Sequence, residues 1–373
     1  METEHAVHVG DARELALPEG SVELVVTSPP YPMIEMWDDL FRRLDPAVGA
    51  ALDAGDGDRA FRSMHDALDP VWDRIAEALA PGGIVCVNVG DATRSVEEFA
   101  LYPNHVEIAR RLRDRGLTQL PGIQWRKPVN RATKFMGSGM LPPNAYPTLE
   151  HEHVLVFRAG GPRSLEPGAD RRYEAAYFWE ERNEWFSDLW EFGGADQRQG
   201  SRFGSGAGEG ADRGGHPGDA ARERSGAYPL ALPARLIRMF TAYGDRVFDP
   251  FWGTGTTTLA AMLAARDSVG CEIDGALVEA FEDRIAGLPE RSREQSRARL
   301  ERHAAFADER DDLAYEAEHY DFGVMTKQER RIRLYAVEEV EKGESDARAD
   351  GDGMNEGDFD RTRWRCEHAP VEF

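Results

Sequence analysis

The chain has 373 residues, 41% of them hydrophobic, and its 68 acidic against 45 basic side chains give a net charge of −23. This size allows one large domain with an insert or a tail. No apolar run is long enough to span a membrane, the first residues do not form a signal peptide and the three cysteines are widely scattered, so the sequence predicts a soluble cytoplasmic protein with no metal site and no disulfide framework.

The acidic excess extends along the whole chain, and arginine carries nearly all of the positive charge. This composition resembles that of proteins from salt-loving archaea. The alternative is an ordinary acidic protein that avoids nucleic acid. The even spread of the acidic residues favours the first interpretation. The only lysines are Lys127, Lys134, Lys327 and Lys342.

Two apolar stretches near the start of the chain predict strands, and each ends in a polar turn. Residues 5–9 lead into Gly10-Asp11, and residues 22–26 lead into Ser28-Pro29-Pro30-Tyr31. The prolines stiffen the second turn. At the carboxyl edge of an open sheet, where α/β proteins bind ligands, its hydroxyl and aromatic ring could hold a planar base with an amino group. Taken alone, the sequence is equally compatible with a plain Pro-Pro turn.

The following residues alternate between helical and strand-like patterns. Residues 37–79 are helical with a break at 53–57, and Asp69-Pro70 predicts a helix start within them. The alternation predicts an α/β fold with a mostly parallel sheet and helices on both faces. The elements expected next are a strand at 84–89, a helix at 105–115 and strands at 120–125 and 154–157.

Residues 160–227 interrupt the alternation and predict an insert. The part after residue 192 is rich in Gly and Arg, which is typical of a segment that is mobile without a partner. The part before it carries aromatic side chains, namely Tyr173, Tyr177, Phe178, Trp179, Trp185, Phe186, Trp190 and Phe192.

A second, glycine-rich turn follows the insert and joins a strand at 246–249 to a helix. Gly253 and Gly255 allow the backbone to approach a ligand closely. Glu272, at the end of the next strand, is placed to hold a ribose diol, and Asp249 suits a ligand with a positive amino group. The turn lacks the third glycine of the dinucleotide fingerprint and the lysine of a phosphate loop. NAD is therefore disfavoured, and a Walker-type site is excluded.

The two turns together resemble a known motif pair. Ser28-Pro29-Pro30-Tyr31, followed far downstream by Asp249-Pro250-Phe251-Trp252-Gly253-Thr254-Gly255-Thr256-Thr257, is similar to the motifs of beta-group DNA amino-methyltransferases, in which the catalytic half precedes the cofactor half. The resemblance covers about residues 5–285. It implies a doubly wound, Rossmann-like sheet of the S-adenosylmethionine-dependent type, S-adenosylmethionine as cofactor and double-stranded DNA as partner. It leaves a homodimer open and implies neither a membrane nor a metal.

The resemblance also implies a division of the chain. Residues 1–159 would form the catalytic half, 160–227 a target-recognition insert, 228–288 the cofactor-binding half, and 289–373 a charged, helical and partly disordered extension. The aromatic residues of the insert could read bases, but a small core beneath a loop explains them equally well.

The site residues that the resemblance implies lie in both turns and at strand ends. Tyr31 would stack on a base flipped out of the duplex, while Ser28 and the Pro29 carbonyl would orient its amino group. The catalytic set is Ser28, Pro29, Pro30 and Tyr31. The cofactor set is Asp11, Asp249, Pro250, Phe251, Gly253, Gly255, Thr256, Thr257 and Glu272.

Serine before Pro-Pro-Tyr is typical, within this family, of cytosine-N4 methylation, with adenine-N6 methylation as the nearest alternative. Cytosine-C5 methylation is disfavoured because no cysteine lies in a Pro-Cys turn. The intact Ser28, Tyr31, Asp249 and Glu272 argue against a catalytically silent DNA-binding or cofactor-sensing protein. RNA methylation is disfavoured because no RNA-binding module flanks the core. The resemblance extends to archaeal enzymes that methylate short palindromic DNA sites, CTAG among them. The sequence identifies neither the DNA site of this protein nor a partner restriction enzyme.

The predicted DNA contacts are basic residues of two segments. The densest positive stretch runs from Arg110 to Lys134, and its helical part could instead be a solvated face balanced by acidic neighbours. The chosen residues are Arg126, Lys127, Arg131, Lys134, Arg198, Arg202 and Arg213.

Overall fold

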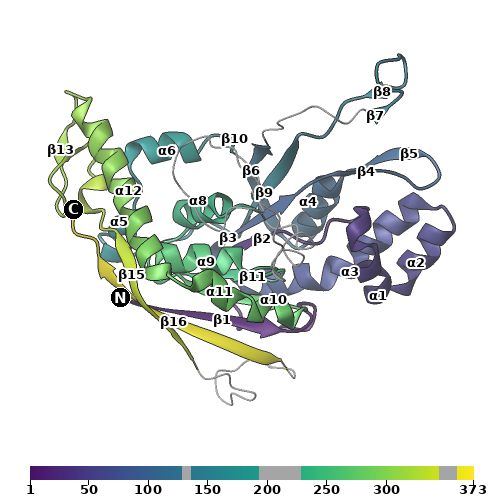
Figure 1. The fold of residues 1–373 in the computed structure, drawn as a ribbon, viewed down its shortest axis with the longest axis horizontal. Helices are drawn as coiled ribbons and strands as arrows, with labels where there is room; N and C mark the ends of the chain where they lie inside the picture. The colour runs from purple at the N-terminus through teal and green to yellow at the C-terminus, as the bar shows by residue number, and fades with distance from the viewer. Residues whose placement is uncertain (128–135, 193–227, 344–358) are drawn as a thin grey trace, which may run out of the picture.

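The computed structural model describes residues 1–127, 136–192, 228–343 and 359–373. Its central feature is a ten-stranded mixed sheet (Figure 1). The strands of this sheet are β1 Glu2–Val9, β2 Val22–Thr27, β3 Leu79–Val89, β6 Leu117–Arg126, β9 His151–Ala159, β10 Leu189–Glu191, β11 Arg246–Asp249, β12 Asp267–Glu272, β15 Tyr335–Lys342 and β16 Asp360–Pro370. They lie in the order β10-β6-β9-β3-β2-β11-β12-β1-β16-β15.

Six short strands form hairpins outside this sheet. They are β4 Ala92–Ser95 with β5 Phe99–Tyr102, β7 Met136–Gly137 with β8 Ala145–Tyr146, and β13 Tyr315–Glu316 with β14 Gly323–Val324. The helices are η1 Glu35–Trp37, α1 Asp38–Leu44, α2 Pro46–Asp53, α3 Gly57–Ala78, α4 Asn104–Asp114, α5 Asp170–Glu174, α6 Trp179–Trp185, α8 Ala231–Phe240, α9 Thr256–Ala264, α10 Gly275–Glu279, α11 Phe281–Ile285, α12 Leu288–Asp308 and η2 Glu329–Arg331. None of the described helices is long and apolar enough to cross a membrane.

The centre of the sheet is parallel, as the sequence predicts. Strands β3, β2, β11, β12 and β1 run in one direction, while β9 and β16 pair antiparallel on either side of them. The α/β, mostly parallel fold class is therefore confirmed. Because β2, β3, β11, β12 and β1 are parallel, the turns that follow them all lie at the same edge of the sheet.

Helices cover both faces of the sheet because its central strands are apolar on both faces. In β3, Val85 and Val87 pack into the core beneath α3 and α4, whereas Cys86 packs into the core beneath α8 and α9. All three side chains are fully buried. This is the pattern expected of a buried parallel strand.

Helix α3 differs from the sequence prediction, which started a helix at Asp69-Pro70. The structure has one continuous helix from Gly57 to Ala78 with Pro70 inside it. A proline in a helix interior costs about 3 kcal/mol. The helix also buries a stripe that includes Met64, Leu68 and Trp72. Burying each large apolar side chain contributes roughly 1.5–3 kcal/mol, so the packed stripe outweighs the proline.

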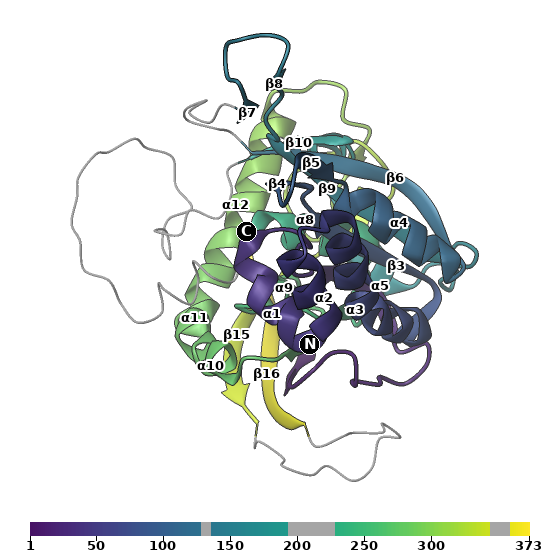
Figure 2. The ribbon, with the colours of Figure 1, turned by 90° about the vertical axis from the view of Figure 1, so that its right-hand side faces the viewer.

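The C-terminal region contains more than the charged helix expected there. Helix α12 is present, but β15 and β16 then extend the central sheet beside β1 (yellow in Figures 1 and 2). Trp364, Cys366 and His368 of β16 are buried, which is the period of two that a strand requires. The acidic composition of residues 343–360 predicts disorder there, but Asp360 instead begins β16, and residues 344–358 lie outside the described residues.

The described part of the predicted insert forms a small aromatic core with the C-terminal region. Phe178 is fully buried and stacks on His303 of α12, with ring centroids 4.0 Å apart. Trp185 is buried beneath Arg299 of α12, whereas Trp190 packs beside Trp125 in the core beneath α8 and α9. Of the two interpretations of these aromatic residues, the structure shows the small core.

Candidate active site

The two sequence motifs meet at the carboxyl edge of the sheet. Thr27 ends β2 and Asp249 ends β11, the strand beside it. The Thr27 hydroxyl donates a hydrogen bond of 2.7 Å to Asp249 Oδ1, across 222 residues of sequence. The Ser28-Pro29-Pro30-Tyr31 turn and the glycine-rich turn are thus fixed to each other by a buried contact.

A hydrogen-bond network holds Tyr31. Its hydroxyl lies 3.0 Å from Ser28 Oγ, 2.9 Å from Asn88 Nδ2 and 3.1 Å from Glu152 Oε2. Its ring packs against Gly90, where a Cβ atom would lie 3.1 Å from Tyr31 Cε2. Burial, with the charge of Glu152, raises the pKa of Tyr31 well above its ordinary value. The phenol therefore keeps its proton at neutral pH.

The network determines which way the hydroxyl hydrogens point. Glu152 also accepts hydrogen bonds from Asn88 and from the Lys127 ammonium group, so it acts as an acceptor. Tyr31 must then donate its single hydrogen to Glu152, and its oxygen accepts from Asn88 and from Ser28. Since Ser28 gives its hydrogen to Tyr31, its lone pairs remain to accept hydrogens from a ligand.

Sequence reasoning did not select Asn88 or Glu152. Asn88 interrupts an otherwise apolar strand, and Glu152 stands between two histidines at the start of β9. A polar residue at the carboxyl end of a buried strand was the available signal. Pairing of Val89 with His153 brings the two strand ends together, and this register is not visible in the sequence.

The glycine-rich loop has the backbone that its glycines predict. Gly253 and Gly255 have φ angles of +57° and +76°, in the left-handed region. A Cβ atom at Gly255 would lie 2.5 Å from Trp252 and 2.6 Å from Phe281. A Cβ atom at Gly253 would meet only the Phe251 carbonyl oxygen, at 3.8 Å, so the space beside this residue is open and can receive a ligand.

Asp249 is buried beneath the loop, and protein donors occupy its carboxylate. Oδ1 accepts from Thr27 and from the Phe251 N–H at 3.1 Å, while Oδ2 accepts from Thr257 at 2.6 Å and Tyr228 at 3.2 Å. Burial raises its pKa in spite of these donors. From the sequence, this carboxylate was expected to bind a positively charged amino group of the ligand. In the structure its oxygens hold the loop in place.

Glu272 and Asp11 lie beside the loop, at the ends of neighbouring strands β12 and β1. The Glu272 carboxylate accepts hydrogen bonds from the backbone N–H groups of Gly253, at 2.7 Å, and Asp274, at 2.9 Å. Burial raises its pKa to about 7. Asp11 pairs with Arg13 and is partly exposed. The Glu272 side chain remains partly accessible, and the ribose role that its position predicts stays a prediction.

The remaining predicted cofactor residues support the same loop. Pro250 and Phe251 form its first turn, and the ring centroid of Phe251 lies 6.1 Å from that of Trp72. Thr256 begins α9, and its hydroxyl accepts a hydrogen bond of 3.1 Å from Arg284. Thr257 bonds to Asp249, so the predicted cofactor residues of this turn form one connected unit.

Asp91, which follows β3 and Gly90, lies in a group with His105 and His153. Their ligand atoms all lie within 4.8 Å of one another, the kind of arrangement that can hold a metal ion. Asp91 accepts from both the backbone N–H and the ring of His105, at 3.1 and 2.8 Å. These bonds fix the first turn of α4 to the end of β3.

The structure describes two of the predicted DNA contacts, and one of them, Lys127, is linked to Tyr31 through Glu152. Lys127 binds Glu152, and Arg126 reaches Glu191 at 3.1 Å. Both follow from the end of β6 at the carboxyl edge. The other predicted contacts lie outside the described residues. These are Arg131, Lys134, Arg198, Arg202 and Arg213.

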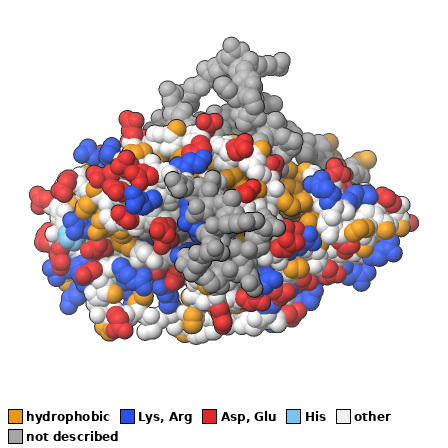
Figure 3. Space-filling model, turned by 90° about the horizontal axis from the view of Figure 1, so that it is seen from below, with side chains coloured by type: hydrophobic (Ala, Val, Ile, Leu, Met, Phe, Trp, Pro, Cys, Tyr) orange, Lys and Arg blue, Asp and Glu red, His pale blue; other side chains and the backbone are white. Residues whose placement is uncertain are grey.

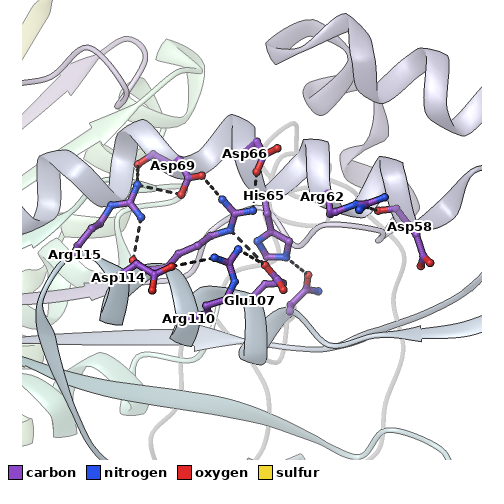
Figure 4. Close-up of polar contacts among 11 residues, drawn as sticks. Asp58, Arg62, His65, Asp66, Asp69, Glu107, Arg110, Asp114 and Arg115 are labelled. Atoms are coloured by element: carbon purple, nitrogen blue, oxygen red, sulfur yellow. Dashed lines mark hydrogen bonds and ion pairs between the residues drawn. The ribbon is translucent and has the colours of Figure 1, made fainter.

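Three arginines in or directly after α4 are balanced by acidic neighbours, as the alternative interpretation held (Figure 4). Arg110 bonds Glu107 and Asp114 at 2.9 and 3.0 Å. Arg115 bonds Asp69 and Asp73 of α3, and Arg111 pairs with Asp66 and Asp69. On the face of the molecule shown in Figure 3, acidic and basic side chains are likewise intermingled. These helix arginines are therefore neutralised within the fold.

Comparison with known proteins adds the following findings. The family model N6_N4_Mtase, described as DNA methylase, matches residues 22–283 and so includes both turns. The type II methyltransferase M.MthZI of Methanothermobacter thermautotrophicus is 45% identical over 341 residues, which cover 90% of this chain and 91% of that protein. The type II methyltransferase M.MjaI of Methanocaldococcus jannaschii is 42% identical over 296 residues, covering 76% and 91%.

A solved structure is similar as well. It is a candidate DNA modification methylase of Thermus thermophilus in complex with S-adenosyl-L-methionine. Its TM-score against this chain is 0.54 and its sequence identity is 28%, over 76% of this chain and 93% of that one.

Proposed function

The chain belongs to the N6/N4 DNA methylase family, and from this premise we propose that it methylates the N4 amino group of cytosine in a short site of double-stranded DNA. S-adenosylmethionine is the cofactor, and when bound it supplies a methyl group on a sulfonium centre. We propose that Gly253, Gly255 and Glu272 line the S-adenosylmethionine-binding site, and that Asp249 holds the glycine-rich loop from beneath.

The acceptor state of Ser28 is the observation that carries the proposal. A serine oxygen with free lone pairs can take one amino hydrogen, and the Pro29 carbonyl can take the other. The lone pair of the amino nitrogen is then left for the methyl group, and positioning lowers the barrier to transfer. We propose that the surplus amino proton leaves through Ser28 or to water after the transfer. Tyr31, fixed by Asn88 and Glu152, offers the stacking surface for the flipped base.

The choice of cytosine rests on serine as the residue before Pro-Pro-Tyr, with adenine N6 as the alternative. Mass spectrometry of nucleosides from duplex DNA treated with the protein and S-adenosylmethionine tests it. We expect N4-methylcytosine with the unaltered protein and none with Ser28→Ala. N6-methyladenine as the product would replace the proposal by the alternative. If the protein binds the cofactor but yields no methylated nucleoside, the result would favour a catalytically silent protein.

We also retain the division of the chain as a proposal, with residues 160–227 as the recognition insert. The described part of this insert packs against α12, so Phe178 and the helix after residue 288 share one core. Residues 193–227, where base reading would take place, lie outside the described residues.

We further propose that the protein works in a cytoplasm of high salt. Phosphate-dominated DNA binding weakens steeply as salt rises, and at 1 M salt the screening length falls to about 3 Å. The net charge of −23 then repels DNA little. At low salt the same charge opposes both folding and DNA approach. Methyl transfer should therefore increase from low salt toward molar KCl before it declines, and highest activity below ~0.1 M with a steady fall above it would contradict the proposal.

A further inference from the structure

A small cavity lies where the described part of the insert, the cofactor-binding half and the C-terminal region meet. Its wall includes three guanidinium groups, one from α8, one from the turn after α9 and one from α12. It has room for about one water-sized sphere. The polar side chains that line it are Arg238, Arg266, Arg299, Tyr243, Ser296 and Tyr335.

The three arginines of the cavity wall outnumber the carboxylates that form ion pairs with them. Arg299 forms two hydrogen bonds with Glu181, at 2.7 and 2.8 Å, and is neutralised. In the described parts of the chain, neither Arg238 nor Arg266 has a carboxylate within ion-pair distance, and Asp245, the nearby acid, is engaged by Arg163 and Arg171. The cavity wall therefore keeps an excess of about two positive charges.

Among the described residues, the hydrogen bonds of Arg238 and Arg266 go to neutral groups, while Glu181 and Asp245 act on them only from beyond ion-pair distance. Arg266 is 2% exposed, donates to the hydroxyl and the carbonyl of Thr241 at 2.9 Å each, and lies 4.4 Å from the ring centroid of Tyr243. Arg238 donates to the carbonyl of Ala234, in its own helix, at 3.0 Å. Burial, together with the charges of Arg299 and Arg266, lowers the pKa of Arg238 to about 9, although the charge of Glu181 acts in the opposite direction. Arg266 is buried and Arg238 is half-buried. A charge withdrawn from water without an ion-pair partner is unfavourable, so the wall favours an anion.

We propose that this cavity binds one small monovalent anion, and that chloride is the ion it takes. The space for one water-sized sphere excludes sulfate and phosphate, whereas chloride, whose radius exceeds that of water by about 0.4 Å, needs the wall to yield only by that amount. The ion neutralises Arg238 and Arg266 and joins α8 to α12. Chloride binding thereby stabilises the attachment of the C-terminal region to the methyltransferase core.

Thermal unfolding of the full chain, in potassium chloride and in potassium gluconate of equal ionic strength, tests this proposal. The unfolding temperature should rise more steeply with chloride concentration than with gluconate concentration. Above saturation, the difference should be about 2 °C for each tenfold increase in chloride concentration. Arg238→Met should lose this chloride-specific increment. Arg302→Met, an exposed arginine of α12 one turn from Arg299, should retain it and controls for general salt effects.

Two outcomes would overturn the proposal. One is equal midpoints of the unaltered protein in the two salts, and the other is an undiminished chloride increment in Arg238→Met. Crystals grown in bromide supply a readout that does not need a variant. Anomalous scattering should place a bromide ion between Arg238 and Arg266, and a cavity without bromide in such crystals would exclude the site.

Discussion

Replacement of Gly255 by valine is expected to weaken S-adenosylmethionine binding by 100-fold or more, on the order of 3 kcal/mol. A β-branched residue at φ +76° is strained. Its Cβ atom would also lie 2.5 Å from Trp252 and 2.6 Å from the Phe281 ring. Both rings are buried and cannot withdraw, so the loop itself must shift away from the cofactor.

Calorimetric titration with the cofactor measures this loss, and circular dichroism verifies the fold. Gly116→Val is the matched control, because Gly116 has a φ of +81° but nothing within 4 Å of its Cβ position. The Gly116→Val protein should have the same strain of a β-branched residue at positive φ, but its affinity for the cofactor should be unchanged. Normal affinity in a folded Gly255→Val protein would remove this loop from the cofactor site.

Replacement of Tyr31 by alanine should leave cofactor binding intact and lower the rate of methyl transfer by about 100-fold or more. Base stacking on an aromatic side chain contributes roughly 1–3 kcal/mol. The change also removes the partner that directs the hydrogen of Ser28 away from the substrate. Tyr31→Phe keeps the stacking surface and loses only the hydroxyl. Its rate of methyl transfer should therefore lie between that of the unaltered protein and that of Tyr31→Ala.

Single-turnover transfer of labelled methyl groups to duplex DNA measures these rates. Tyr315→Ala, on hairpin β13–β14, serves as the control and should transfer at the normal rate. Unchanged transfer by Tyr31→Ala would exclude the stacking role. A Tyr31→Phe rate as low as that of Tyr31→Ala would assign the whole effect to the hydroxyl network.

Local features of the fold could be predicted because their signals are local. The apolar run before Ser28 and the glycines after Asp249 specify a strand and a turn without reference to the rest of the chain. Parallel strands then bring such turns to one edge, which is why both motifs could be assigned to one site.

Features that depend on distant pairing could not be predicted. The contact of Tyr31 with Glu152 spans 121 residues and follows from the register of β3 with β9. The ion pairs of Arg115 depend on the packing of α4 against α3. Strand β16 pairs with β15 and also with β1, more than 350 residues away, and its pattern alone did not reveal that distant partner.

The position of β1 between β12 and β16 constrains the order of events on the ribosome. His5 of β1 hydrogen-bonds Ser268 of β12, which is translated 263 residues later, and β16 is translated later still. At about 5–20 residues per second, the first strand waits roughly 15 to 70 seconds for its neighbours. Strands β2, β3, β6 and β9 can pair during that time. Strand β1 must therefore stay unpaired, yet free of wrong partners, until β12 has been synthesised.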